Sequence, residues 1–194
     1  MREGKVVFKE YTESSKVTLE YTRTINNPIH YIRPVEITLY TYTLPNGNSR
    51  ELNRLKVEYK LPKIKQVLFA IHPCDAHAVK YLDRVLIGKS IVDPYYKVLR
   101  DNTVIVVLEC NSSDEYCFCE TLETYRTPEE TVDIKLARVR EGYIVKPLSK
   151  TGRRIVEKLL ADILVEYSGE WPKRKPGNII GFEKSKLKDR KSVV

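Results

Sequence analysis

The fold is decided by one short stretch of the chain, Val67-Leu68-Phe69-Ala70-Ile71-His72-Pro73-Cys74-Asp75. Its first five residues are apolar without alternation, which is typical of a strand covered on both faces. Pro73 ends this run, and residues 76–86 then place apolar side chains at the three- and four-residue spacing of a helix. Asp75 is expected to cap that helix at its start, and Gly88 to end it.

A second buried strand is predicted over residues 103–108, so that strand, helix and strand form a right-handed βαβ unit with parallel strands. Residues 93–96, Asp-Pro-Tyr-Tyr, are expected to lie in a loop between them. Residues 132–139 and 143–148 predict a hairpin that turns at Glu141-Gly142, and residues 153–165 a helix. We expect a mixed α/β fold with a βαβ-containing sheet, flanking helices and an added antiparallel hairpin.

The amino-terminal part predicts two further strands, over residues 5–25 and 35–44, followed by a turn at Pro45-Asn46-Gly47. With 194 residues and 42% apolar content, the chain suffices for one main core. We therefore expect a single domain over residues 1–171 and a basic, flexible tail over residues 172–194.

The formal net charge of +8 is concentrated in this tail, where eight Lys and Arg face only Glu183 and Asp189. Residues 1–171 carry only +2, which argues against a nucleic-acid-binding body. The tail is suited either to solvent or to an acidic partner protein.

No apolar run approaches the roughly 18 residues of a membrane span, and the start of the chain has no apolar core of a secretory signal. The expected location is the cytoplasm. The abundance of Lys, Glu, Ile and Val, with a single Met, is typical of thermophile proteins.

All four cysteines lie near the ends of the two predicted buried strands, at positions Cys74, Cys110, Cys117 and Cys119. Adjacent parallel strands bring their carboxyl ends to one edge of a sheet, so four thiols can converge there. Four is the number of ligands of a zinc ion or of a cubane iron-sulfur cluster. The spacing Cys-x6-Cys-x-Cys differs from the paired spacing of zinc sites, which favours the iron-sulfur interpretation.

Three neighbouring side chains could support such a site. His72 and His77 flank Cys74, and Asp75 follows it; each could hydrogen-bond to a ligand or replace one. The alternatives to an iron-sulfur site are a zinc-stabilised structural or nucleic-acid-associated domain, and a scaffold whose cysteines bind nothing. No nucleophile triad, phosphate loop or zinc-protease motif indicates catalysis within the chain.

Five sequence islands in order carry a resemblance to a known family: Pro73-Cys74-Asp75, Leu82-Asp83, Asp93-Pro94-Tyr95-Tyr96, Cys110, and Cys117-Phe118-Cys119. They resemble the amino-terminal domain of the iron-sulfur beta subunits of cytoplasmic NiFe hydrogenases of the sulfhydrogenase type. The related iron-sulfur subunit of anaerobic sulfite reductase is similar. The resemblance covers about residues 28–150.

The resemblance implies a non-catalytic electron-transfer subunit that binds one 4Fe-4S cluster through Cys74, Cys110, Cys117 and Cys119. It also implies partners, namely a catalytic subunit and a ferredoxin- or flavin-bearing subunit. This sequence differs from the family at His72, where the family has arginine, and at residues 120–125, where the family is glycine-rich. It contains no C-x2-C-x2-C-x3-C-P repeat, so a stand-alone version of the first domain with at most one cluster is expected.

Overall fold

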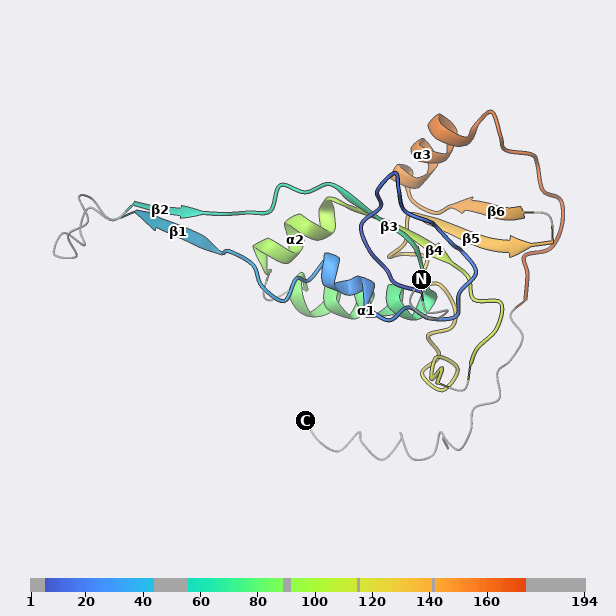
Figure 1. Ribbon diagram of the computed structural model, residues 1–194, viewed down its shortest axis with the longest axis horizontal. Helices are drawn as coiled ribbons and strands as arrows, with labels where there is room; N and C mark the ends of the chain where they lie inside the picture. Colours follow the sequence, from blue (N-terminus) through green and yellow to red (C-terminus); the bar gives the residue numbers. More distant parts are fainter. Residues whose placement is uncertain (1–5, 44–55, 89–91, 115, 141, 174–194) are drawn as a thin grey trace.

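The computed structural model describes residues 6–43, 56–88, 92–114, 116–140 and 142–173. Its elements, in chain order, are η1 (Pro28–Tyr31), β1 (Tyr40–Thr43), β2 (Lys56–Tyr59), β3 (Gln66–Ile71), α1 (Pro73–Leu86), α2 (Pro94–Asp101), β4 (Thr103–Leu108), β5 (Ile134–Val139), β6 (Gly142–Pro147) and α3 (Lys150–Leu160). The predicted mixed α/β fold is confirmed (Figure 1). The predicted turn at Pro45-Asn46-Gly47, Glu141 of the second turn, and residues 174–194 of the tail lie outside the described residues.

The main sheet has the strand order β3-β4-β5-β6. Strands β3, β4 and β5 are parallel, with Leu68 opposite Ile105 and Val106 opposite Ile134. Strand β6 pairs antiparallel with β5 and forms the predicted hairpin. Helix α1 follows β3, and β4 lies directly beside β3, so the predicted βαβ unit is confirmed.

Both faces of this sheet are covered, and alternate residues of the strands face opposite sides. On one face, the side chains of β3 and β4 pack with α1 and Tyr96 of α2, through Leu68, Ile71, Val79, Ile105 and Val107. On the other face, β4 and β5 pack with α3, through Val106, Leu108, Ile134, Leu136 and Val156. The continuous apolar run of β4 reflects burial on both sides, as expected for a parallel strand. In β3 the predicted burial on both faces holds only in part, because Val67 and Phe69 are 55 and 48% exposed and only Ala70 of that face is buried.

Helix α1 begins three residues earlier than predicted, and Asp75 is not its N-cap. His72 is the N-cap, Pro73 is the first helical residue, and Asp75 is the third. Proline is well suited to the first helical position, because its fixed φ is helical and no hydrogen bond needs its missing N–H. The Asp75 carboxylate instead accepts the backbone N–H of His72 at 3.2 Å, so it stabilises the helix start from inside the first turn.

The prediction of a loop at residues 93–96 was wrong, because these residues begin α2. The Asp93 carboxylate accepts the backbone N–H groups of Tyr95 and Tyr96 at 2.9 and 3.0 Å, and Pro94 is the first helical residue. Tyr96 is buried against the core, and its hydroxyl donates to Asp83 of α1 at 2.7 Å. The Leu82-Asp83 and Asp93–Tyr96 islands are therefore joined by packing between α1 and α2.

The predicted strand over residues 5–25 was also wrong. Among its described residues, the backbone pairing is a single bridge between Val6 and Thr24. The side chain of Asn26 bonds the backbone N–H and C=O of Phe8, in place of a strand ladder. Leu19 and Tyr21 pack on the main core individually, which explains their loose alternation without a strand.

Two other predicted elements differ in their bounds. Of the predicted strand 35–44, only Tyr40–Thr43 is regular among the residues described there. Helix α3 spans Lys150–Leu160 rather than 153–165, because the Ser149 hydroxyl caps it by accepting the N–H of Gly152 at 2.9 Å. Ile163 and Leu164 lie beyond the helix and are exposed.

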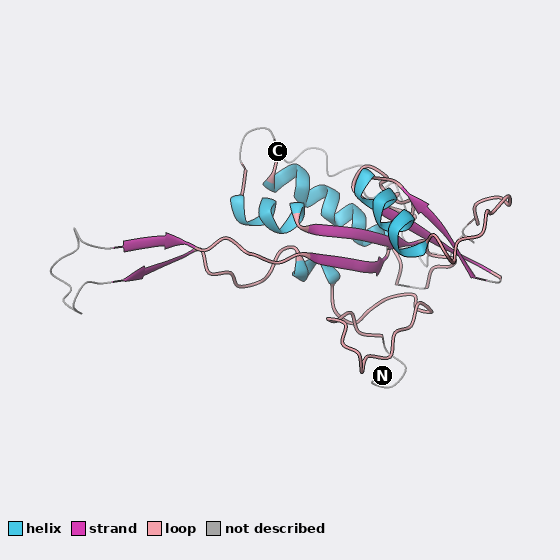
Figure 2. Ribbon diagram, turned by 90° about the horizontal axis from the view of Figure 1, so that it is seen from above, coloured by secondary structure: helices cyan, strands magenta, loops and turns pink. Residues whose placement is uncertain are grey.

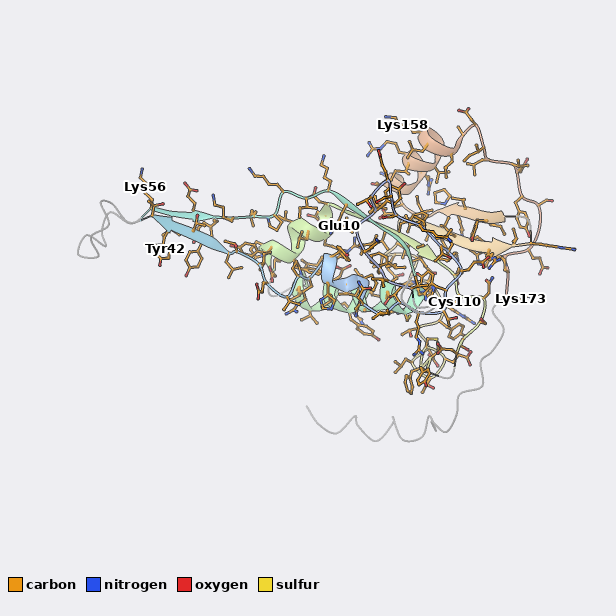
Figure 3. All side chains as sticks on the ribbon, viewed as in Figure 1. Glu10, Tyr42, Lys56, Cys110, Lys158 and Lys173 are labelled. Atoms are coloured by element: carbon orange, nitrogen blue, oxygen red, sulfur yellow. The ribbon has the colours of Figure 1, made fainter. Side chains whose placement is uncertain are left out.

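Strands β1 and β2 form a separate two-stranded ribbon that extends away from the main sheet (Figures 1 and 2). Tyr40 pairs with Tyr59 and Tyr42 with Val57, so these four side chains share one face. The opposite face carries Thr41, Thr43, Lys56 and Glu58. Lys56 and Tyr42 accordingly point to opposite sides of the ribbon in Figure 3, and every residue of both strands is exposed.

Candidate metal centre

The carboxyl edge of the parallel strands brings two of the predicted ligands together. Cys74 is the second residue of α1, immediately after β3, and Cys110 follows the end of β4 by two residues. Since β3 and β4 are parallel neighbours, both cysteines lie at the same edge of the sheet.

The other two cysteines lie in the connection between β4 and β5, residues 109–133. This connection contains no helix or strand among its described residues. It runs from the carboxyl edge back to the start of β5, as a parallel pairing requires, but without the usual crossover helix. Loops longer than about 12–15 residues without regular structure are uncommon in compact domains and are usually functional.

The electrostatic environment shows which cysteines are neighbours. Burial, together with the nearby Asp75 and Cys119, raises the pKa of the Cys74 thiol to about 12. Part of Cys74 is nevertheless exposed to solvent, so this residue lies in a partly covered position. Burial also raises the pKa of Cys117, whose neighbours include Asp114 and Cys119. Cys119 is thus close to both Cys74 and Cys117.

Tyr21 connects this group to the fourth cysteine. Burial raises the pKa of the Tyr21 hydroxyl, and Asp75, Cys110 and Cys74 add to the shift. Tyr21 therefore lies near both Cys74 and Cys110. Within the described ranges, however, no three His, Cys, Asp or Glu side chains are already arranged to hold a metal ion. The donor set fits a cubane cluster in kind and number, and its ligation by these four residues stays a prediction.

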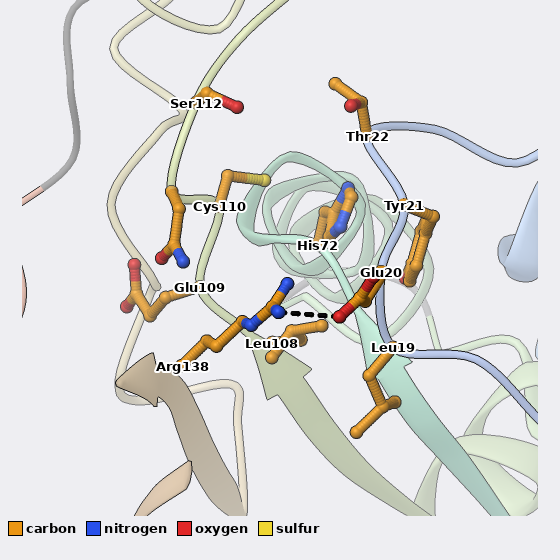
Figure 4. A pocket seen from close by; sticks show the side chains of 11 residues that line it. Leu19, Glu20, Tyr21, Thr22, His72, Leu108, Glu109, Cys110, Ser112 and Arg138 are labelled. Atoms are coloured by element: carbon orange, nitrogen blue, oxygen red, sulfur yellow. Dashed lines mark hydrogen bonds and ion pairs between the residues drawn. The ribbon is translucent and has the colours of Figure 1, made fainter. Parts of the chain in front are cut away.

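A cleft of about 240 Å³ opens beside Cys110 (Figure 4). One wall is the chain segment before residue 23, and the other is the end of β4 and the start of the loop. Across it, Arg138 of β5 forms an ion pair with Glu20 at 2.6 Å. The lining residues are Leu19, Glu20, Tyr21, Thr22, His72, Leu108, Glu109, Cys110, Asn111, Ser112 and Arg138.

Tyr21 is a site residue that the sequence alone did not indicate. Its ring stacks on His72, with centroids 4.3 Å apart and planes 10° from parallel, and its hydroxyl donates to the carbonyl of Ala70. Ala70 has φ of 60°, a left-handed conformation that costs a non-glycine residue about 1–2 kcal/mol. This strained residue lies in a β-bulge of β3, four residues before Cys74.

Asp114 is a second residue that sequence reasoning missed, and it holds Cys117 locally. The backbone N–H of Asp114 donates to the sulfur of Cys117 at 3.4 Å, and the thiol donates to the Asp114 carboxylate at 3.2 Å. Its other carboxylate oxygen lies 3.3 Å from Nε of Arg23. The signal in the sequence is the three-residue spacing of an Asp before a Cys, which is too common to be diagnostic.

The two histidines have structural roles in this arrangement. His72 is 5% exposed and is the N-cap of α1, stacked on Tyr21. His77 lies one turn along α1, and its Nε2 hydrogen-bonds with the carbonyl of Arg126 at 2.8 Å, which ties the helix to the cysteine loop. Burial raises the pKa of Asp75, while the hydrogen bond from His72 opposes that shift. A supporting role of His72, His77 and Asp75 for a metal remains a prediction.

Comparison with known proteins identifies one relative of this chain. Over 149 residues, the chain is 32% identical to sulfhydrogenase 2 subunit beta of Pyrococcus furiosus. The chain is related to a hydrogenase beta subunit. The matched residues are 77% of this chain and 41% of the relative, so the chain spans less than half of the length of that protein.

This similarity supports the hydrogenase beta-subunit family that the five sequence islands indicate. No family model matches the chain, and no solved structure matches it. Among the described residues of the present chain, no helix is long and apolar enough to cross a membrane.

Proposed function

We propose that this protein is an electron-transfer subunit of a hydrogenase-like oxidoreductase complex. Its residues Cys74, Cys110, Cys117 and Cys119 bind one 4Fe-4S cluster in this proposal. The observation that carries the proposal is the position of Cys74 and Cys110 at the carboxyl ends of the parallel neighbours β3 and β4, with Cys117 and Cys119 in the loop that follows. The similarity to a sulfhydrogenase subunit supports the redox interpretation. A bound cluster would supply one-electron transfer, at a potential set by its hydrogen bonds and its exposure.

The protein contributes ligands from both rigid and irregular segments. Cys74 is held by the first turn of α1, and Cys110 by the end of β4. Cys117 and Cys119 come from the long loop, which can close over a cluster because its described residues have no strand or helix to unfold. The Asp114 N–H that donates to the sulfur of Cys117 is the kind of hydrogen bond that tunes the potential of a cluster.

Anaerobic purification, followed by iron, sulfide and electron paramagnetic resonance measurements, tests the cluster. We expect about four iron and four sulfide per chain, and a signal on reduction. Cys117→Ser should lose most of the iron, whereas Ser112→Ala, a change in the same loop that removes no thiol, should retain it. A wild-type protein that stays colourless after reconstitution would refute the cluster, and equimolar zinc without sulfide would favour the zinc-stabilised alternative.

The partners proposed are a catalytic subunit and a ferredoxin- or flavin-bearing subunit, and the ribbon supports assembly with another protein. Tyr40, Tyr42 and Tyr59 are 54, 61 and 79% exposed on one uncharged face. A two-stranded ribbon is marginally stable alone, and an exposed aromatic face favours contact with a partner.

Co-expression with hydrogenase subunits encoded by neighbouring genes tests this assembly. We expect Tyr42→Ser with Tyr59→Ser to weaken co-purification, whereas Thr41→Ser on the polar face should not. Equal recovery of the complex with both variants would exclude the aromatic face as a contact.

A further inference from the structure

The segment Leu19–Thr24 crosses the carboxyl edge of the sheet and is attached to three separate parts of the protein. We call these residues the strap. Glu20 pairs with Arg138 of β5, and Tyr21 bonds the bulge of β3 at Ala70. Arg23 reaches the cysteine loop. The strap is not a strand: its backbone pairing is one bridge between Thr24 and Val6, and side-chain contacts attach it to the sheet and to the cysteine loop.

Arg23 makes two contacts with the cysteine loop. Its Nε lies 3.3 Å from the Asp114 carboxylate, and its guanidinium carbon lies 4.3 Å from the centroid of the Tyr116 ring. Asp114 begins the turn that ends at Cys117, and Tyr116 directly precedes Cys117. A guanidinium can pair with a carboxylate and stack on an aromatic ring at the same time, which an ammonium group does less well.

Side-chain contacts fasten this loop to the rest of the protein at several places, among them one near Cys117 and one against α1. Near Cys117, the ion pair and the ring contact of Arg23 join Asp114 and Tyr116 to the strap. Farther along, His77 binds the carbonyl of Arg126 and Lys80 pairs with Glu130, which anchors the later part of the loop to α1. Arg23 therefore holds the part of the loop that carries Cys117.

We propose that Arg23 is a positioning residue for the metal centre: through Asp114 and Tyr116 it holds the Cys117 turn against the body, where Cys74 and Cys110 lie. This inference rests on the proposed function for its metal, but the fastening of the loop is a property of the protein itself. The two can therefore be tested separately.

The first test measures the loop in the metal-free protein by hydrogen–deuterium exchange. Arg23→Ala should speed exchange in the peptides that cover residues 109–120 by about 3- to 10-fold, the factor expected from losing an exposed ion pair and a cation–π contact. Arg23→Lys should restore part of the protection. Arg126→Ala is the matched control: Arg126 also stacks on a tyrosine of this loop, but that tyrosine is its own neighbour Tyr125, so the contact does not join the loop to the strap.

The second test measures the reconstituted protein, by the rate at which a chelator removes iron and by the reduction potential. Arg23→Ala should release iron several-fold faster and shift the potential, with an unchanged melting temperature of the core. Exchange in Arg23→Ala equal to that in wild type would overturn the positioning role, whatever metal is bound. Faster exchange in a protein that takes up no cluster would instead support the strap and refute the proposed cofactor.

Discussion

Substitution of Asp83 tests how this protein holds α1 and α2 together. Its carboxylate accepts the Tyr96 hydroxyl at 2.7 Å, and both of its oxygens lie 3.2 Å from the Arg100 Nε. The Nη2 of Arg100 donates a hydrogen bond of 2.9 Å to the carbonyl of Thr131, at the end of the cysteine loop. The side chains of Asp83 and Arg100 are 24 and 16% exposed, so solvent screens this group only partly.

Replacing Asp83 by Asn keeps the shape but removes the charge. A hydrogen bond to a charged group contributes about 1.5–3 kcal/mol and a neutral one about 1 kcal/mol. Asp83→Asn weakens two charge-assisted bonds, so we expect a loss of about 2 kcal/mol in the free energy of unfolding. Tyr96→Phe removes one bond and should cost about 1 kcal/mol. For a chain of this size, about 2 kcal/mol corresponds to a fall of roughly 4–8 °C in melting temperature.

Urea unfolding and calorimetry of the single and double variants measure these values. The double variant should lose less than the sum of the single variants, by about 0.5 kcal/mol, because the two residues share one bond. Lys97→Gln on α2 is the control: its pair with Asp101 is exposed and should contribute less than about 0.5 kcal/mol. If Asp83→Asn costs no more than this control, the network does not stabilise the contact between the two helices.

Two further predictions concern contacts near the start of β5. Gly152→Ala would place a Cβ 2.1 Å from the carbonyl oxygen of Asp133, so α3 must shift; we expect a loss of about 2–4 kcal/mol by urea unfolding, and near-neutral behaviour of the exposed Arg153→Ala. The hydrogen bond from Lys135 lowers the pKa of Glu129 below its ordinary value of 4.5, so its stabilising effect is present above that pH and is lost as pH falls through the folded-state pKa. The difference in melting temperature between wild type and Glu129→Gln should therefore be largest at about pH 6 and shrink below about pH 4, and a constant difference would contradict this assignment.

The main sheet could be predicted from the sequence because its signals are local and strong. The continuous apolar runs of residues 67–71 and 103–108 mark β3 and β4, and the hairpin of β5 and β6 is marked by its own turn. The prediction failed where hydrogen bonds from a side chain to the backbone decided the local structure. Asp93 caps a helix that looked like a loop, and Asn26 bonds Phe8 where a strand ladder was expected.

The candidate site was predictable only in part for the same reason. Cys74 and Cys110 follow directly from the ends of two parallel strands. Tyr21, Arg23 and Asp114 did not, because their partners lie up to 93 residues away in the chain and no local spacing marks such contacts.

The sequence by itself therefore determined the mixed α/β class, the edge of the sheet at which Cys74 and Cys110 lie, and the number of thiols in the chain. Strand burial and strand direction depend on the order of apolar residues along the chain, which can be read without coordinates. Only the tertiary structure decided that the segment before residue 25 crosses that edge as a strap, and that the aromatic face of the ribbon stays uncovered. Both depend on which residues far apart in the chain come into contact. The free energy of such a contact depends on both residues together and not on either sequence position alone.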